Sequence, residues 1–289
     1  MDEFSKILAK YDAAYVSTHL HSAGDINRFA ATFYKDVAEI YDCITRARNT
    51  ERNPVGFGLN EAPILGLLVR VWKLLKEVIR YYEADNAEMI AVMERPLIEA
   101  SVTAEYLLRN GDAAVEDYRK LSYKDRLRLL RQLKEGSPFF GTKAGQRLLR
   151  SVREKMAFEG LTESDFEAQK KNRWRLQGKT FFDIFAEVIH EDLYASSYGM
   201  MSESVHGSWN ESLDYSLRKN DDGTFLAWPF FQPADIRFVT PTIRFCNPAY
   251  CSWVERAGLA ESDLLKTLEW IDRVNAALYR RFDDLYDGA

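Results

Sequence analysis

His206 ends a stretch in which polar residues recur at intervals of four. Tyr198 and Ser202 follow this spacing, as do His190 and Tyr194 further upstream. In a helix each step of four residues rotates by about 40°, so Tyr198, Ser202 and His206 share one face. An imidazole can act as a general acid or base near neutral pH. The spacing therefore predicts a polar stripe, which serves either acid–base chemistry or a buried hydrogen-bond network that fixes helix packing.

A second group of polar residues lies in an earlier, apolar helix. Arg95 and Glu99 are four residues apart, a spacing at which opposite charges can pair on a helix. Their sequence neighbours are apolar: Ile90, Val92, Leu97, Ile98, Val102 and Leu107. Charged groups in such a setting need polar partners, and Tyr198, Ser202 and His206 are the candidates. We hypothesise that the two groups form one site; the alternative is a structural ion pair between Arg95 and Glu99.

Motifs for metal or nucleotide binding are missing from the sequence. His190 and His206 are sixteen residues apart, about 24 Å along a helix, which is too far for one metal ion. The sequence has no His-Glu-x-x-His, Gly-x-Gly-x-x-Gly or Gly-x-Ser-x-Gly pattern, and the segment from Gly141 to Gly145 is too short for a phosphate-binding loop. We therefore expect neither a metal nor another cofactor.

Positive charge is concentrated in residues 119–155. This segment has twelve Lys or Arg against three Asp or Glu, a net charge of +9, which leaves −14 for the rest of a chain whose total is −5. Its arginines are candidates for phosphate contacts with nucleic acid: Arg126, Arg128, Arg131, Arg147, Arg150 and Arg153. The alternative is a solvated helix face that pairs with acidic neighbours.

The composition is that of a globular chain. Hydrophobic residues make up 46% of the 289 residues, enough for a sizeable core, and the net charge of −5 argues against general attraction to nucleic acid or membranes. No run approaches the roughly 18 apolar residues of a membrane span, and the acidic start of the chain lacks a signal core. Cys43, Cys246 and Cys251 show no paired spacing. These features predict a cytoplasmic protein with reduced thiols and no membrane association.

The elements that must position these residues are mostly helices. Apolar residues at helical spacing predict helices over residues 2–20, 25–48, 61–84, 86–109 and 263–286, two within 112–158, a short one near 163–171, and one from about 180 into the polar stripe. Pro96 predicts a kink or a new helix start. Gly111 predicts a helix end, and Gly207 predicts the end of the stripe helix.

The sequence changes character after residue 207. Alternating residues around Asn220-Asp221-Asp222-Gly223 predict a β-hairpin, and the prolines between 229 and 248 predict irregular structure. The fold class is therefore mostly α, a helical bundle with a small β-hairpin insertion. We expect a single domain, with its core at about 60–210, the hairpin and irregular segment at about 211–258, and a C-terminal helix at about 262–287.

Two motifs resemble those of an uncharacterised family of bacterial all-helical proteins. Arg95-Pro96-Leu97-Ile98-Glu99 is similar to that family's Arg-x-x-x-Glu helix. Tyr198-x-x-x-Ser202-x-x-x-His206-Gly207-Ser208 is similar to its later Ser-x-x-x-His-(Gly/Pro)-Ser helix end. The likeness covers about residues 60–210. It implies an all-helical fold and no particular activity.

The same motifs are similar, more loosely, to HEPN domains, which are helical bundles of toxin–antitoxin and phage-defence RNases. Those domains use an arginine a few residues ahead of a histidine, usually across a dimer interface and without metal. This sequence has Gly199, Met200 and Met201 ahead of His206, so Arg95 would supply the arginine from another helix. The resemblance implies a HEPN-like core.

Two functions are open at this point. The first is a HEPN-like protein that binds or cleaves RNA in a bacterial defence or stress module, as a metal-independent RNase. His206 would be its acid or base and Arg95 its phosphate stabiliser, with Tyr198, Ser202 and Glu99 as orienting groups. Its partners would be RNA, a second copy of the chain or a protein of the same module. The alternative is a non-enzymatic scaffold or regulator that binds a protein partner. A small-molecule pocket between the two helices is a third option.

Overall fold

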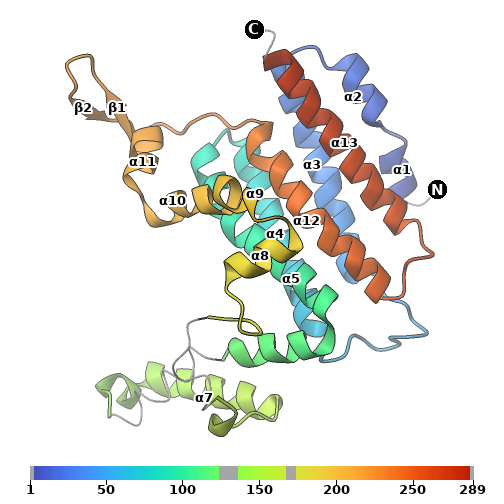
Figure 1. Ribbon diagram of the computed structural model, residues 1–289, viewed down its shortest axis with the longest axis vertical. Coiled ribbons are helices and arrows are strands. Elements are labelled where there is room, and N and C mark those ends of the chain that lie inside the picture. Colours follow the sequence, from blue (N-terminus) through green and yellow to red (C-terminus); the bar gives the residue numbers. More distant parts are fainter. Residues whose placement is uncertain (1–2, 124–135, 167–173, 287–289) are drawn as a thin grey trace. The chain divides into compact units, whose positions relative to one another are not determined.

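The computed structural model describes residues 3–123, 136–166 and 174–286. Most of them are helical, and one two-stranded sheet accompanies the helices (Figure 1), which confirms a mostly α fold with a small hairpin. The long helices are α3 (Ala23–Arg46), α4 (Ala62–Glu83), α5 (Ala87–Leu121), α7 (Lys143–Phe158), α12 (Ile236–Arg256) and α13 (Leu264–Tyr286).

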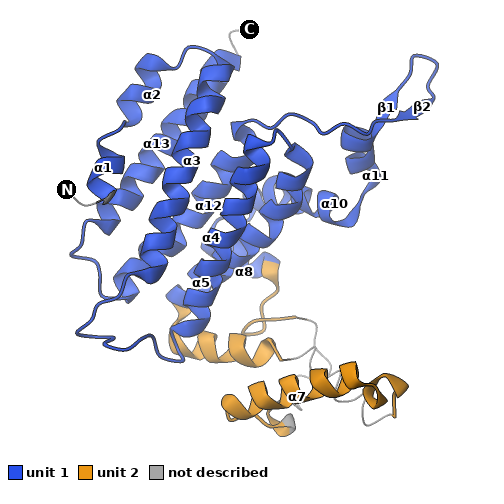
Figure 2. Cartoon of the chain, turned by 180° about the vertical axis from the view of Figure 1, so that it is seen from behind, with its two compact units in different colours: residues 1–109, 182–289 blue, residues 110–181 orange. Residues whose placement is uncertain are grey.

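The chain divides into two compact units (Figure 2). Unit 1 comprises residues 1–109 and 182–289, and unit 2 comprises residues 110–181. Unit 1 contains the Arg95 helix and the polar stripe, so the candidate site lies within one unit. That the whole chain forms a single domain stays a prediction.

The core of unit 1 is formed by α3, α4, α12 and α13. These helices pack on one another through apolar faces, and burial of each large side chain contributes about 1.5–3 kcal/mol. Buried hydroxyls in this core are paired: Tyr34 contacts Thr240 at 2.8 Å, and Tyr41 donates to Asn247 at 3.1 Å. The ring of Tyr41 also stacks on that of Tyr250 with 3.8 Å between centroids. The predicted helices 25–48, 61–84 and 263–286 correspond to α3, α4 and α13.

The irregular structure expected up to residue 258 is wrong for its second half, because α12 runs from Ile236 to Arg256. Pro241 and Pro248 both lie inside this helix. Each removes one backbone hydrogen bond, at a cost of about 3 kcal/mol in an exposed helix. In α12 the fully buried side chains on its inner face, among them Trp253, outweigh that cost.

The N-terminal region also differs from the expected single helix over 2–20. It forms α1 (Glu3–Leu8) and α2 (Ala13–His19). The side chains of Lys10 and Tyr11 in the break both bind the buried carboxylate of Asp36, at 2.8 and 2.7 Å. Asp12 then caps α2 by accepting from the backbone N–H of Tyr15. These contacts favour the break between α1 and α2 over a continuous helix.

Helix α5 continues through Pro96 without leaving helical geometry. The departure occurs at Gly111, whose φ of 72° and ψ of −164° lie outside the range of ordinary residues. Helical geometry resumes after Gly111 and continues to Leu121. The new helix start, one of the two alternatives at Pro96, is therefore wrong, and a kink there stays a prediction. The interruption lies fifteen residues further along, where the chain passes from unit 1 to unit 2.

The polar stripe belongs to a composite helix rather than to one regular helix. α8 (Phe181–Val188) ends before it, and the composite helix consists of α9 (Asp192–Tyr194), a π turn η3 (Ala195–Gly199) and α10 (Met200–His206). Gly207 ends α10 in the left-handed conformation, with φ 63°, as predicted. The continuous helix expected from residue 180 is therefore wrong, since residues 189–191 interrupt it.

The expected hairpin is confirmed. After α11 (Trp209–Glu211) and a second π turn, η4 (Ser212–Ser216), strand β1 (Leu217–Lys219) pairs antiparallel with β2 (Phe225–Ala227). The hairpin projects away from the helices of unit 1 in both views (Figures 1 and 2).

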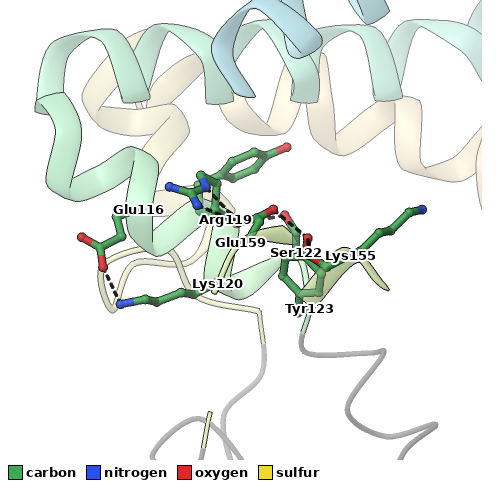
Figure 3. A network of polar contacts seen from close by, with 8 residues as sticks. Glu116, Arg119, Lys120, Ser122, Tyr123, Lys155 and Glu159 are labelled. Carbon is green, nitrogen blue, oxygen red and sulfur yellow. Dashed lines mark hydrogen bonds and ion pairs between the residues drawn. The ribbon is translucent and has the colours of Figure 1, made fainter. Parts of the chain in front are cut away.

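Unit 2 contains the end of α5, the short turns η1 (Pro138–Gly141) and η2 (Glu163–Phe166), and α7. Its small core consists of Tyr123, Phe140, Leu149, Val152 and Met156. A half-buried network supports this core: Arg119 contacts Glu159 at 2.8 Å, and Glu159 also accepts from Tyr123 at 2.6 Å (Figure 3). Parts of the helices expected within 112–158 and near 163–171 lie outside the described residues.

Candidate functional site

Arg95 on α5 and His206 at the end of α10 are in direct contact. Nη1 of Arg95 lies 3.1 Å from Nε2 of His206. Because a guanidinium has only donors, Nε2 must be the acceptor in this contact, and the ring then carries its hydrogen on Nδ1. The imidazole is exposed and Arg95 is half-buried. The structure therefore brings the two sequence groups together at a surface that solvent reaches.

Tyr198 lies beneath this pair and bridges it to Glu99. Its hydroxyl accepts from Nε of Arg95 at 3.2 Å and donates to Oε2 of Glu99 at 3.3 Å. The guanidinium carbon of Arg95 also lies 4.8 Å from the centre of the Tyr198 ring, a cation–π distance. The direct ion pair expected between Arg95 and Glu99 is wrong, since Tyr198 occupies the space between them.

The π turn explains how Tyr198 points inward. A π turn contains one more residue per turn than an α-helix, so it shifts the face on which the following side chains lie. Gly199 permits the turn, because a Cβ there would lie 3.3 Å from the carbonyl oxygen of Tyr194. Tyr198 is consequently buried, and its ring lies close to those of Tyr194 and Phe185.

Burial controls the protonation of Tyr198. Desolvation and the nearby Glu99 carboxylate together raise the pKa of its phenol to about 12, although the hydrogen bond from Arg95 opposes both. The phenol is therefore protonated at neutral pH and able to donate to Glu99. In this arrangement Tyr198 orients Arg95 and is not a proton-transfer group.

Two other predicted residues of the stripe act elsewhere. Ser202 donates its hydroxyl hydrogen to the backbone carbonyl of Tyr198 at 3.1 Å, so this contact stabilises the composite helix. His190 lies before the composite helix, and its Nδ1 is 3.3 Å from a carboxylate oxygen of Asp192. The polar stripe was expected to extend back to His190. This extension is wrong, because residues 189–191 interrupt the helix before α9.

Comparison with known families shows that a single family match spans both groups of the site. The family recorded as "Family of unknown function (DUF5677)" matches residues 61–224. The chain belongs to the DUF5677 family. The match includes Arg95 and Glu99, the whole composite helix and strand β1. No curated protein and no solved structure matches the chain. The resemblance to an uncharacterised helical family is thereby confirmed, and the likeness to HEPN domains stays a prediction.

A buried carboxyl group adjoins the site of this DUF5677 member and was not distinguished by sequence reasoning. Glu94 is 5% exposed, and it accepts a hydrogen bond from the Thr242 hydroxyl at 2.9 Å. Burial raises the pKa of Glu94 to about 8. A helix turns by about 100° per residue, so Glu94 faces α12 while Arg95 faces the composite helix. The proline-rich sequence of α12 concealed this contact, because it did not predict a helix there.

The basic segment of the DUF5677 chain is only partly described. Arg147, Arg150 and Arg153 are exposed on α7, and within the described residues none of them forms an ion pair. Arg119 and Lys120, in contrast, bind Glu159 and Glu116. Arg126, Arg128 and Arg131 lie outside the described residues. Arg147, Arg150 and Arg153 are therefore available for contacts with phosphate, and the binding itself stays a prediction.

Two further properties apply to the described part of this DUF5677 protein. Within residues 3–123, 136–166 and 174–286, no three His, Cys, Asp or Glu side chains form a group that could hold a metal ion. Over the same ranges, no helix combines the length and apolar character that crossing a membrane requires. Cys43, Cys246 and Cys251 form no disulfide bond with one another.

Proposed function

We propose that this member of the DUF5677 family binds RNA and cleaves it without a metal ion, as part of a bacterial defence or stress module in the cytoplasm. The observation that carries the proposal is the 3.1 Å contact between Arg95 and the exposed His206. A cation beside an imidazole suits a phosphodiester substrate, because the guanidinium stabilises charge on the phosphate while the imidazole transfers a proton.

The hydrogen-bond donors that Arg95 leaves available for a phosphate support this role. Nε of Arg95 binds Tyr198 and Nη1 contacts His206, while Nη2 has no partner among the described residues. Arg95 also lacks a carboxylate partner in the described chain, since Glu99 is held by Tyr198. A guanidinium that is oriented but not neutralised retains donors for a phosphate oxygen.

The proposed reaction is an internal transesterification of RNA. When RNA binds, the contact from Nη1 of Arg95 opens and frees Nε2 of His206, which removes the proton of the 2′-hydroxyl as that oxygen bonds to phosphorus. The bond from phosphorus to the 5′-oxygen breaks, and that oxygen takes a proton from water. The products are a 2′,3′-cyclic phosphate and a 5′-hydroxyl, and the ring returns its proton to solvent. Arg95 stabilises the extra negative charge on phosphorus oxygens, and Tyr198 with Glu99 holds Arg95 in position. The exposed arginines of α7 provide sequence-independent contacts to the RNA backbone.

The test compares RNA with a matched strand that carries deoxyribose at every position, incubated with the full chain in excess chelator. We expect cleavage of RNA alone, with cyclic phosphate ends, and its loss in His206→Ala and Arg95→Ala. His190→Ala is the control, since it removes an exposed histidine that is outside the composite helix. Cleavage of the deoxyribose strand, or equal activity in His206→Ala, would contradict the proposed chemistry.

A non-enzymatic scaffold is the second candidate, and the bridge through Tyr198 favours it. Arg95, buried Tyr198 and Glu99 connect α5 to the composite helix, as expected of a packing network. In that case Arg95→Ala and Tyr198→Ala lower the melting temperature strongly, because buried polar groups lose partners at about 1–3 kcal/mol each. A stable wild type that neither binds nor cleaves RNA in low salt would favour the scaffold.

A further inference from the structure

The hairpin β1–β2 is an unusually exposed element for its size. Each strand has three residues, and the sheet consists of these two strands alone. An isolated two-stranded hairpin of this length is marginally stable in water. All three residues of β2 are exposed, including Phe225 and Leu226, the latter at 59%. The hairpin therefore presents apolar side chains and unpaired strand edges away from the helical core.

The register determines which backbone groups are free on β2. Asn220 N–H donates to Thr224 at 2.9 Å, and Trp228 N–H donates to Ser216 at 2.8 Å. Antiparallel ladders bond at alternate residues, so between these two pairs Leu226 is the residue of β2 that bonds to β1. The N–H and C=O groups of Phe225 and Ala227 consequently point toward the open edge of β2.

The two open edges differ in charge. Strand β1 carries the exposed cations Arg218 and Lys219, and two copies of β1 paired about Arg218 would place like charges directly opposite each other. Strand β2 consists of Phe225, Leu226 and Ala227 and has no charge. Charged residues on an edge block strand pairing, so β1 is protected and β2 is not.

We infer that the chain forms a homodimer in which β2 pairs antiparallel with β2 of a second copy, about a two-fold axis at Leu226. In this arrangement Phe225 of each copy lies opposite Ala227 of the other, and all four outward-facing N–H groups find carbonyl acceptors. Leu226 then lies opposite itself as a non-hydrogen-bonded pair, the closer kind of antiparallel pair. The result is a four-stranded sheet, β1–β2–β2–β1, whose charged strands are outermost.

Exposed apolar residues beside β2 extend the same surface. Phe230 and Phe231 follow the strand and are 62% and 66% exposed. Trp209, 60% exposed, lies against Phe225 with 5.9 Å between ring centres. An exposed apolar surface of this kind marks an interaction site, and Pro229 limits the ladder to β2, because it has no N–H to donate. This inference does not depend on the proposed enzymatic activity.

Cysteine cross-linking of the full chain tests the geometry. Leu226→Cys places two thiols across the axis at a Cα separation of about 4.5 Å, within the range for a disulfide. Arg218→Cys is the matched control: it lies on the same face of the hairpin, directly opposite Leu226, but the two copies are about 14 Å apart. We expect oxidised Leu226→Cys to run as a covalent dimer and Arg218→Cys not to. Equal cross-linking of both variants, or of neither, overturns the inference.

Sedimentation over a concentration series provides the second test. We expect the wild type to dimerise, and Leu226→Glu, which sets two carboxylates opposite each other, to be monomeric. Ala227→Pro removes the N–H that points to the open edge and leaves the hairpin's own bonds intact, so it should also be monomeric. Circular dichroism of both variants should match the wild type, since neither residue belongs to the core. A monomeric wild type, or a dimer that both substitutions leave intact, overturns the inference.

Discussion

The hydroxyl of Thr242 on α12 donates a hydrogen bond to Oε1 of Glu94 on α5 at 2.9 Å. Glu94 is buried, and burial raises its pKa from 4.5 to about 8. Between these two pH values the native state keeps a proton that the unfolded state has lost. The free energy of unfolding therefore falls as pH rises through this window, by at most about 1.4 kcal/mol per pH unit.

Replacing Glu94 tests this dependence. Glu94→Gln keeps an oxygen that can accept from Thr242 and cannot ionise, so we expect it to raise the melting temperature above pH 8 and to flatten the decline between pH 5 and 8. Thermal melts at a series of pH values provide the measurement. Glu99→Gln, an exposed glutamate on the same helix, should keep the decline. A decline that persists in Glu94→Gln would assign the dependence to another group.

Removing the hydroxyl of Tyr198 tests the orientation of Arg95. Tyr198→Phe keeps the buried ring and its cation–π contact but loses the hydrogen bonds to Arg95 and Glu99. We expect a loss of stability of about 1–2 kcal/mol and a fall in RNA cleavage by about tenfold to a hundredfold. The measurements are a denaturant titration and single-turnover cleavage. Full activity in Tyr198→Phe would show that this bridge does not orient the reacting groups.

The exposed arginines of α7 carry a prediction about salt. The double variant Arg147→Glu, Arg150→Glu should bind RNA more weakly for all sequences, with a smaller dependence of affinity on salt concentration. The control is a second double variant, Arg70→Glu with Lys73→Glu. These exposed cations on α4 have the same spacing, and their substitution changes the net charge equally. Filter binding over a salt series distinguishes the two. Equal weakening by both double variants would indicate a general effect of net charge.

Gly145 carries a prediction about unit 2. A Cβ at Gly145 would lie 2.3 Å from the carbonyl oxygen of Phe139, so Gly145→Ala forces α7 away from the η1 turn. We expect a loss of stability of about 1–3 kcal/mol and faster amide exchange over residues 138–158. Gly141→Ala is the control, since a Cβ there meets no atom within 4 Å. Unchanged exchange in Gly145→Ala would mean that the turn can shift without loss of packing.

Amphipathic pattern alone predicted the long helices of the core and the hairpin. In α3 and α13 the apolar spacing is regular, and Asn220 to Gly223 is a strong turn signal. The sequence pattern did not predict α12, because the local backbone preferences of Pro241 and Pro248 are outweighed by burial of residues such as Trp253. That burial depends on α3 and α4, more than 150 residues away in sequence, as well as on α13, and no local pattern reports it.

For the candidate site, the two groups of residues were predicted, but the contacts between them were not. Four-residue spacing indicated that Tyr198 and His206 share a face, and the polar residues in apolar α5 indicated a need for partners. The insertion of Tyr198 between Arg95 and Glu99 depends on the π turn. A π turn follows from packing around Gly199 rather than from helical periodicity, so the sequence predicted a direct ion pair instead.

The division of unit 1 into residues 1–109 and 182–289 has a consequence during protein synthesis. Tyr34 and Tyr41 on α3 find their buried partners Thr240 and Asn247 on α12, more than 200 residues later. The ribosome must therefore produce all of unit 2 and most of the chain before the apolar faces of α3 and α4 can be covered. A nascent chain of this protein exposes those faces for tens of seconds at typical rates of translation, about 5–20 residues per second. Such a chain is a substrate for chaperones that bind exposed apolar helices.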